Sequence, residues 1–464
     1  MSLIKSISGF RGTIGGNVGE NLTPIDIVSC TSAFGTFVKS QHENPTVVIG
    51  RDGRVSGEIV NQLVIQTLRS LGINVVDLGL STTPTVEIAV PVEKAHAGII
   101  ITASHNPKQW NALKFLNHKG EFISAKDGEK VLEILAENQY DFCSVDNLGS
   151  YRQDNSYIQK HIDMIFELEL VDVEKVKAKT FKIVVDCINS TGAISVKPLL
   201  EQMGCEVILI NEEITGNFAH NPEPLKEHLR ELEQSVLNNR AHLGIAVDPD
   251  VDRLVFMCED GELFGEEYTI VSLASYILKH KKGNTVSNLS STRALGDVTR
   301  KAGGEYFASA VGEVNVVEMM KEVNAVFGGE GNGGVIYPEF HYGRDALVGI
   351  ALMLTHLADF GKSISFLRST YPNYQMSKNK ISLDPKLDMD KVFEGIKAKY
   401  SREKITLVDG VKIDFESGWI HLRKSNTEPI IRIYTEADSQ VAADAYAQKI
   451  MNDITELIKA KSEN

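Results

Sequence analysis

Residues 46–54 read TVVIGRDGR, a short apolar stretch that ends abruptly in charged residues and glycine. A run of four to eight apolar residues that stops at a polar turn is typical of a buried strand. A helical stretch ending in LRSLG follows, and then a second strand-like stretch, INVVDLG, over residues 73–79. The order strand, polar turn, helix, glycine, strand predicts one unit of an α/β domain.

The same unit occurs twice more along the chain. The second copy runs from FKIVVDCINSTGA (181–193) through LLEQMG to CEVILIN (205–211), and the third from NTVSNLSSTRA (284–294) through VTRKAGG to EYFASAVG (305–312). Any α/β protein contains such units, but all three copies share a glycine directly before the second strand, namely Gly72, Gly204 and Gly304. Repetition of this kind favours three similar, duplicated domains.

After about residue 370 the pattern changes. YQMSKNKISLD (374–384) and KLDMDKVFEGIKAKY (386–400) predict a strand and a helix, and alternation with turns at 409–410 and 417–418 predicts hairpins before a final helix. We therefore expect a smaller α+β domain at this end. The expected domains are 1–150, 151–256, 257–370 and 371–464.

Composition narrows the class of protein. Of 464 residues, 48 are Lys or Arg and 62 are Asp or Glu, so the formal net charge is −14, which disfavours broad nucleic-acid binding. No stretch approaches the roughly 18 consecutive apolar residues of a membrane span, and the first residues do not resemble a signal peptide. Five scattered cysteines without a CxxC pair suit reduced thiols, so we expect a cytoplasmic protein.

The stretch TASHNPKQWNALKF directly follows the apolar run of residues 97–101. A serine placed after a strand, where backbone N–H groups point into a turn, can hold a phosphate or carry one itself. His105 and Lys114 lie near Ser104 in sequence and offer cationic or proton-transfer groups. Taken alone, the stretch fits an ordinary polar turn at least as well.

The stretch DPDVDR (248–253) interrupts a second apolar run with three aspartates at alternate positions, Asp248, Asp250 and Asp252. Side chains at alternate positions of a strand end point the same way, and three converging carboxylates require a cation. Oxygen ligands favour Mg²⁺. An EF-hand loop is excluded by Arg253 at its obligatory glycine position, and an aspartyl-phosphate phosphatase by Asp252, where Thr or Val is expected.

Two further loops provide weaker signals. FGGEGNGGVIYP (327–338) carries Glu330 and Asn332 among five glycines, which permit close approach of a ligand such as a sugar. RKSNTEPIIRIY (423–434) offers a guanidinium and short polar side chains before a proline, a suitable cradle for phosphate. The cradle residues are Arg423, Ser425, Asn426 and Thr427.

Taken in this order, from GFRGTIGG (9–16) to RKSNTEP (423–429), the stretches resemble the α-D-phosphohexomutase superfamily, which includes phosphoglucosamine mutase, phosphomannomutase and phosphoglucomutase. The resemblance spans essentially the whole chain, and TASHNP and DPDVDR are its most specific motifs. It implies three similar mixed α/β domains and a smaller C-terminal α+β domain around a central cleft.

The resemblance also implies roles for individual residues. Ser104 would be the phosphorylated serine, and its phosphoryl oxygen would complete a site for one Mg²⁺ with Asp248, Asp250 and Asp252. The remaining roles follow position by position: Arg11, His105 and Lys114 beside the transferring phosphate, Arg253 after the metal loop, Glu330 and Asn332 at the sugar, and Arg423, Ser425, Asn426 and Thr427 at the phosphate that does not react.

The implied reaction moves a phosphoryl group between the 6- and 1-positions of a hexose phosphate through a hexose 1,6-bisphosphate. Lys114 is the candidate base, which requires neighbours that lower its pKa. Glucosamine 6-phosphate is the expected substrate, although GEGNGG (329–334) lacks the Ser and His of many members and Asn426 replaces a glycine of typical bacterial phosphoglucosamine mutases. Mannose or glucose phosphates are the alternative substrates, while a silent sugar-phosphate-binding protein and a phosphatase are the alternatives of other classes. A monomer or homodimer is expected, with no membrane or nucleic-acid partner.

Overall fold

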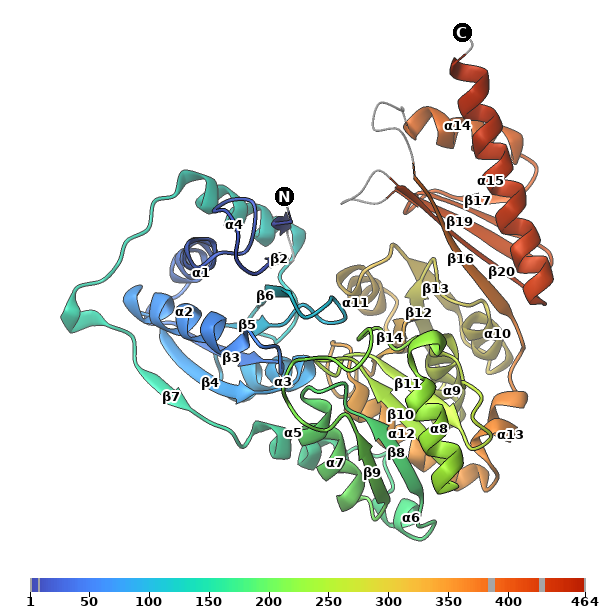
Figure 1. Ribbon diagram of the computed structural model, residues 1–464, viewed down its shortest axis with the longest axis horizontal. Helices are drawn as coiled ribbons and strands as arrows, with labels where there is room; N and C mark the ends of the chain where they lie inside the picture. Colours follow the sequence, from blue (N-terminus) through green and yellow to red (C-terminus); the bar gives the residue numbers. More distant parts are fainter. Residues whose placement is uncertain (1, 7–8, 383–388, 425–429, 463–464) are drawn as a thin grey trace. The chain divides into compact units, whose positions relative to one another are not determined.

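The computed structural model describes residues 2–6, 9–382, 389–424 and 430–462. The chain divides into two compact units, one made of residues 1–273 and 332–368 and the other of residues 274–331 and 369–464. Figure 1 shows the course of the chain through its helices and strands. Among the described residues, no helix is long and apolar enough to cross a membrane.

The first sheet, in the first unit, has seven strands in the order β1-β2-β6-β5-β3-β4-β7. Strands β3, β4 and β5 are parallel, whereas β6 runs antiparallel to both β5 and β2. The strands are β1 (Ile4–Ser6), β2 (Gly9–Thr13), β3 (Thr46–Arg51), β4 (Asn74–Leu80), β5 (Ala97–Ile101), β6 (Trp110–Leu116) and β7 (Tyr151–Gln153). The helices that follow them are α1 (Pro24–Lys39), α2 (Gly57–Ser70), α3 (Thr83–Val92) and α4 (Ala125–Glu137), with a short 3₁₀ turn, η1 (Val145–Asn147).

Helices cover both faces of this sheet (Figure 1). Successive strand side chains point to opposite faces. Val47 and Ile49 accordingly join the core under α1, α2 and α4, while Val48 joins the core under α3. A strand buried on both faces has no polar side, which explains why TVVI is continuously apolar.

The second sheet also belongs to the first unit and has the order β11-β10-β8-β9. β8 (Lys182–Asp186) is parallel to β9 (Glu206–Ile210) and β10 (Leu243–Val247), and β11 (Leu254–Cys258) is antiparallel to β10. The long apolar helix α12 (Ala346–Phe360) packs on the helices of this sheet and is buried over most of its length. The helices in this part of the chain are α5 (Tyr157–Phe166), α6 (Val173–Lys177), α7 (Gly192–Gln202), η2 (Lys226–His228) and α8 (Arg230–Asn239). The short strand β15 (Gly334–Ile336) also lies in the first unit but is not one of the strands of this sheet.

The second unit contains a parallel arrangement of β13 (Tyr306–Ser309), β12 (Asn284–Asn288) and β14 (Ala325–Glu330), with α10 (Ala294–Lys301) and α11 (Glu313–Glu322). It also contains an antiparallel sheet of order β16-β20-β19-β18-β17, packed against α14 (Met389–Lys399) and α15 (Gln440–Ser462). The strands are β16 (Gln375–Ser382), β17 (Lys404–Thr406), β18 (Val411–Phe415), β19 (Gly418–Lys424) and β20 (Ile430–Ala437). Helices α9 (Glu266–His280) and α13 (Ile364–Ser369) cross the division between the units.

The threefold repeat in the sequence is present in the structure. In each copy the two strands of the unit are parallel neighbours: β3 and β4, β8 and β9, and β12 and β13. Gly72 and Gly204 end their helices with φ of 80° and 76°, a left-handed conformation that glycine adopts without steric cost. In the third copy the left-handed residue is Gly303, with φ 82°, and Gly304 lies so close to the chain that a Cβ atom would be 2.0 Å from the carbonyl oxygen of Gly283.

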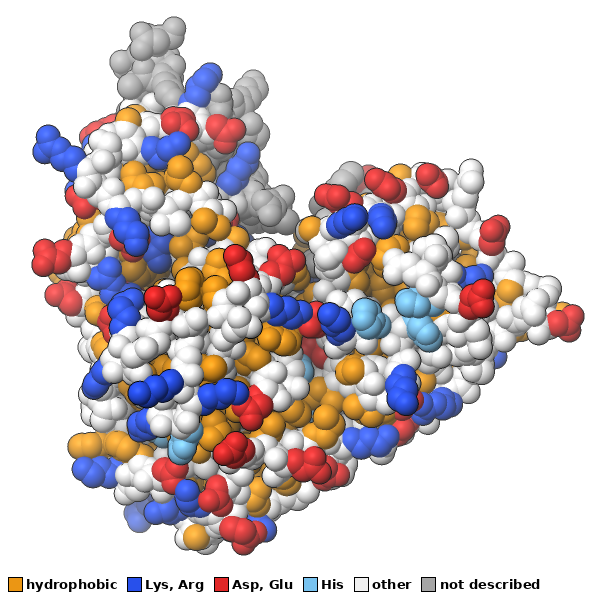
Figure 2. Space-filling view, turned by 180° about the vertical axis from the view of Figure 1, so that it is seen from behind, with side chains coloured by type: hydrophobic (Ala, Val, Ile, Leu, Met, Phe, Trp, Pro, Cys, Tyr) orange, Lys and Arg blue, Asp and Glu red, His pale blue; other side chains and the backbone are white. Residues whose placement is uncertain are grey.

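The predicted fold class is confirmed: mixed α/β sheets precede an antiparallel sheet with two helices. The first sheet continues to β7 at residue 153 and the second to β11 at residue 258, a few residues beyond the expected boundaries at 150 and 256. Acidic and basic side chains are interspersed over the face drawn in Figure 2, so the excess of negative charge is spread over this surface.

Candidate active site

Residues 102–109, which connect β5 to β6, form a loop that contains Ser104 and is called the serine loop. It begins at the carboxyl edge of the parallel strands of the first sheet. Ser104 is 4% exposed and has a left-handed φ of 48°, which is unusual for a residue with a side chain. Its Oγ donates a hydrogen bond to Asp248 Oδ2 at 2.6 Å, while the Nδ1 atom of His105 lies farther away, at 3.3 Å. The serine hydroxyl is therefore directed at the aspartate cluster.

The aspartate cluster lies on the connection between the antiparallel strands β10 and β11. The sequence predicts that the three carboxylates converge because they extend a strand, and that reason is wrong. Residues 248–253 form a tight turn in which Val251 is left-handed, with φ 61°, and its N–H donates to the carbonyl of Asp248. The turn nevertheless brings one oxygen of each aspartate within 4.8 Å of the others, and all three residues are buried.

The cluster fits a divalent cation that prefers oxygen ligands. Asp250 Oδ1 and Asp252 Oδ1 are buried and have no hydrogen-bond partner among the residues that the structure describes. Burial, followed by the charges of Asp252 and Asp250, raises the pKa of Asp248 well above its usual value. Buried carboxylates that repel one another in this way require positive charge, and three carboxylates with no nitrogen or sulfur ligand suit Mg²⁺.

Lys114, on β6, supplies positive charge to this cluster. Its Nζ lies 3.0 Å from Asp250 Oδ2 and 3.9 Å from Asp252 Oδ2. Burial opposes the charged form of Lys114, but the two carboxylates outweigh it and raise the pKa of the amine. The pKa of Lys114 is therefore shifted in the opposite direction from the one that a role as base requires, because Asp250 and Asp252 outweigh burial and the charges of Arg344 and Arg11.

The surroundings of His105 lower the pKa of its side chain, whereas those of Lys114 raise the pKa of the amine. Burial, and then the charges of Arg253, Arg11 and Arg344, lower the pKa of its imidazole to about 2. The ring is consequently neutral across the physiological pH range. Because the Ser104 hydroxyl donates to Asp248 instead, the geometry differs from that of a serine hydrolase, in which histidine accepts the serine proton.

Three arginines surround the cluster. Arg11 Nη1 donates to Asn106 Oδ1 at 2.9 Å, in the serine loop, and its pKa is lowered by burial. Arg253 Nη1 lies 3.2 Å from Glu223 Oε1, and its Nε lies 4.0 Å from Asp248 Oδ2. Arg344, which the sequence analysis did not identify, lies just before α12 and donates to Asp252 Oδ2 at 2.7 Å.

Thr83 is a second residue that sequence reasoning missed. It follows β4 and donates to Asp250 Oδ2 at 2.7 Å, while its own N–H donates to the carbonyl of Asp250. A usable signal was present, because polar residues after neighbouring parallel strands meet at the same edge of a sheet. Thr83, which begins α3 just after β4, and Ser104, in the loop just after β5, satisfy that rule.

The predicted sugar loop crosses the division between the units. Glu330, at the end of β14, is buried, and its Oε1 accepts hydrogen bonds from Asn288 Nδ2 at 2.9 Å and from the N–H of Gly312 at 3.2 Å. Asn332 is half-buried, and its Oδ1 accepts from the N–H of Gly334. Glu330 is thus held by neighbours in the second unit, whereas Asn332 belongs to the first.

The predicted phosphate cradle is described only in part. Arg423, at the end of β19, is half-buried and forms an ion pair with Asp409, with 2.7 Å between Nε and Oδ2. Asp409 also accepts a hydrogen bond from the N–H of Val311. Ser425, Asn426 and Thr427 lie outside the described residues.

Family models match most of the chain, one after another. They are described as phosphoglucomutase/phosphomannomutase, alpha/beta/alpha domain I for residues 4–141, domain II for 159–261, domain III for 265–374, and the C-terminal domain for 383–453. The serine loop falls within the first match and the aspartate cluster within the second.

Curated relatives match over nearly their full length. A phosphoglucomutase/phosphomannomutase from Thermococcus kodakarensis is 35% identical, with 97% of this chain and 99% of the relative covered. A probable phosphoglucosamine mutase from Methanopyrus kandleri is 34% identical, with 94% and 95% covered.

Solved structures share the fold. A phosphoglucomutase/phosphomannomutase family protein from Burkholderia thailandensis superimposes with a TM-score of 0.84 at 26% identity, covering 98% of this chain and 97% of that one. A more distant neighbour is the Aspergillus fumigatus N-acetylphosphoglucosamine mutase, solved in complex with GlcNAc-6P and magnesium. Its TM-score is 0.59 at 13% identity, with 98% of this chain and 96% of that one covered, so it supports the fold alone.

Proposed function

The chain belongs to the phosphoglucomutase/phosphomannomutase family, and from that membership we propose that it moves a phosphoryl group between the 6- and 1-positions of a hexose phosphate, with Ser104 as the phosphoryl carrier. One observation carries the assignment to this serine: the buried Ser104 hydroxyl donates to Asp248, within a cluster in which two carboxylate oxygens have no hydrogen-bond partner among the described residues. Ser104, the three aspartates and the basic residues Arg11, Lys114 and Arg253 all belong to the first unit.

In the proposed reaction the bond between phosphorus and Ser104 Oγ breaks as a bond forms to the free hydroxyl of the sugar. The sugar hydroxyl gives up a proton and Ser104 Oγ gains one. In the second transfer Ser104 Oγ loses this proton and takes up the other phosphoryl group of the hexose 1,6-bisphosphate, and the sugar oxygen that is released gains a proton. Positioning and electrostatic stabilisation supply most of the acceleration in such transfers. Arg11 and Arg253 are proposed to orient and neutralise phosphate oxygens, which is supported by their contacts with Asn106 of the serine loop and with Asp248.

Lys114 takes a different role from the one that the sequence predicts. Its amine is protonated beside Asp250, so we propose that it stabilises charge on the transferring phosphoryl group. A role as base would first require Lys114 to lose this proton. His105, which is neutral, is proposed to orient the phosphoserine through a hydrogen bond.

Asp248, Asp250 and Asp252, with a phosphoryl oxygen on Ser104, are the proposed holders of one Mg²⁺ per chain. When bound, this ion offsets negative charge on the transferring phosphoryl oxygens. Glu330 and Asn332 are proposed to bind sugar hydroxyls. Arg423, Ser425, Asn426 and Thr427 are proposed to hold the phosphate that does not react, and Arg423 must then share its guanidinium between that phosphate and Asp409.

We infer that glucosamine 6-phosphate is the preferred substrate and glucosamine 1-phosphate the product. The relative from Methanopyrus kandleri, a probable phosphoglucosamine mutase, supports this choice. The relative from Thermococcus kodakarensis, a phosphoglucomutase/phosphomannomutase, supports the alternative of glucose and mannose phosphates.

A comparison of kcat/KM for glucosamine, glucose and mannose phosphates tests the substrate preference. We expect glucosamine 6-phosphate to lead by about 10-fold or more, since one recognised polar substituent provides discrimination of at least that order. For each sugar, conversion of the 6-phosphate to the 1-phosphate and the reverse reaction are both measured. The assays contain saturating Mg²⁺ and a small, catalytic amount of hexose 1,6-bisphosphate. A lead of mannose or glucose phosphate would replace the glucosamine assignment and leave the mutase reaction intact.

We propose a cytoplasmic location for the protein from its composition and its free thiols. All five cysteines are free, which suits a reducing cytoplasm. The net charge of −14 favours small-molecule substrates over nucleic acid. A monomer or a homodimer is proposed, without a membrane partner.

A further inference from the structure

Arg54 follows β3 in the motif GRDGR and is only 1% exposed. It does not contact the aspartate cluster, yet its guanidinium donates into the serine loop. Both terminal nitrogens are used: Nη1 donates to two backbone carbonyls at 2.9 and 3.0 Å, and Nη2 to two more, one of them at 2.7 Å. The four acceptors are the carbonyls of Ser104, Asn106, Pro107 and Trp110.

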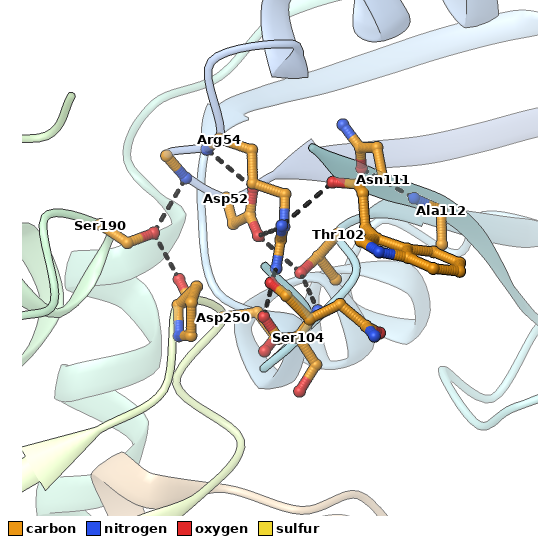
Figure 3. Close-up of polar contacts among 12 residues, drawn as sticks. Asp52, Arg54, Thr102, Ser104, Asn111, Ala112, Ser190 and Asp250 are labelled. Atoms are coloured by element: carbon orange, nitrogen blue, oxygen red, sulfur yellow. Dashed lines mark hydrogen bonds and ion pairs between the residues drawn. The ribbon is translucent and has the colours of Figure 1, made fainter. Parts of the chain in front are cut away.

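Asp52 holds this guanidinium in place. Its Oδ2 accepts from Arg54 Nε at 3.0 Å and from Thr102 Oγ1 at 2.6 Å, and its Oδ1 accepts from the N–H of Arg54. Thr102 Oγ1 in turn accepts from the N–H of Ser104 at 2.9 Å. Figure 3 shows Arg54 and Asp52 beside Thr102 and Ser104. The carbonyl of Ser104 accepts a hydrogen bond from Arg54, and its N–H is connected through Thr102 to Asp52, so both backbone polar groups of Ser104 depend on this ion pair.

Residues 52–54 are also connected to the loop of residues 248–253, which carries the aspartate cluster. The N–H of Gly53 donates to Ser190 Oγ at 3.0 Å, and Ser190 Oγ donates to the carbonyl of Pro249 at 2.6 Å. Gly53 permits this approach because a Cβ atom there would lie 2.9 Å from Ser190 Cα. Residues 52–54 therefore tie the serine loop and the aspartate loop to one another.

This support is needed because Ser104 is left-handed. For a residue with a side chain, a φ of 48° brings Cβ close to the following carbonyl and persists only where surrounding contacts hold it. The conformation is what directs Oγ to Asp248 at 2.6 Å. A loop released from Arg54 would relax toward an ordinary backbone conformation and carry Oγ away from that position.

We propose that Arg54, oriented by Asp52, is a positioning residue for phosphoryl transfer: its planar guanidinium holds the serine loop in the conformation in which Ser104 Oγ meets the metal cluster. The inference rests on the proposed role of Ser104. Lysine cannot replace Arg54, because a single ammonium nitrogen with three donors cannot serve four carbonyls and a carboxylate in one plane.

The test compares Arg54→Lys with the control Arg69→Lys. Arg69 lies in the same domain as Arg54, and its Nε also donates to a backbone carbonyl, that of Gly149, at 3.0 Å. This contact involves neither the serine loop nor the aspartate cluster. Each purified variant is phosphorylated with glucose 1,6-bisphosphate, the phosphorylated fraction is counted by intact mass, and transfer to hexose phosphate is timed in a single turnover. Misplacement of a reacting atom by about 1 Å costs on the order of 100-fold in rate, so Arg54→Lys should lose about that factor per phosphorylated chain.

A purely structural role for Arg54 predicts a different result. It would lower the folded fraction and the melting temperature without changing the rate per phosphorylated chain. On our proposal that rate falls while KM for the hexose phosphate stays within about 3-fold of the wild type, because the Arg54 guanidinium is engaged by backbone carbonyls and Asp52. Added guanidinium, but not methylammonium, should restore part of the rate of Arg54→Ala.

Thr102→Val is a second, milder variant that keeps side-chain volume and removes the bonds to Asp52 and to the N–H of Ser104. It should lose about 10-fold in the same assay. Wild-type transfer rates per phosphorylated chain in both Arg54→Lys and Thr102→Val would overturn the proposal. Full activity of Ser104→Ala would instead overturn the proposed function, so the two failures are distinguishable.

Discussion

Ser104→Ala is expected to lose hexose phosphate mutase activity by on the order of 10⁴-fold or more, because the variant has no oxygen to carry the phosphoryl group. The protein should remain folded. The substitution removes one hydrogen bond to Asp248, whose other oxygen still accepts from the N–H groups of Asp252 and Arg253. We therefore expect a change of only about 1–2 kcal/mol in the free energy of unfolding.

Ser124→Ala is the matched control for this variant. Ser124 also donates to an aspartate, Asp127 at 2.8 Å, but it caps helix α4 away from the cluster. Its loss should cost about 1 kcal/mol of stability and leave kcat unchanged. A Ser104→Ala protein with wild-type activity would contradict the assignment of the carrier.

Asp252→Asn is expected to weaken Mg²⁺ binding by about 100-fold or more and to reduce activity in parallel. The amide is a poorer ligand than the carboxylate, and the substitution also removes the charge that faces Arg344 and Lys114. Wild-type enzyme treated with a chelator should lose activity and recover it on addition of Mg²⁺. Metal binding is measured by calorimetry, independently of turnover.

Asp77→Asn is the control for a buried carboxylate outside the cluster. Asp77, on β4, accepts from Asn61, from Tyr151 and from the N–H of Gly79. This variant should be less stable than the wild type but should bind Mg²⁺ equally well. Unchanged Mg²⁺ affinity in Asp252→Asn, or full activity after removal of divalent ions, would contradict the metal site.

Much of the fold could be predicted from local pattern. The strand at 46–51 is continuously apolar because both of its faces are covered, and the stretches after residue 370 alternate because their sheet packs against helices on one side. The serine and aspartate loops could be located for a related reason, since both interrupt apolar strands with polar residues. Local sequence carries this information directly.

The contacts that position those loops could not be predicted in the same way. Arg344 and Thr83 meet the cluster only after strands and helices far apart in sequence have packed together. The left-handed conformation of Val251 is contrary to the preference of a β-branched residue, so no local rule indicates the turn that brings the aspartates together. The raised pKa of Lys114 likewise depends on which charges are its neighbours in space.

The most direct test of a phosphoryl carrier at Ser104 is a chase of labelled phosphoenzyme. The protein is loaded with ³²P from labelled glucose 1,6-bisphosphate, freed of excess label, mapped to confirm the modified peptide, and mixed with unlabelled glucosamine 6-phosphate and Mg²⁺. The account predicts that label leaves the Ser104 peptide within one turnover and appears in hexose bisphosphate and then in hexose monophosphate. Label that remains on the protein during turnover, or that appears as inorganic phosphate at the turnover rate, would contradict it.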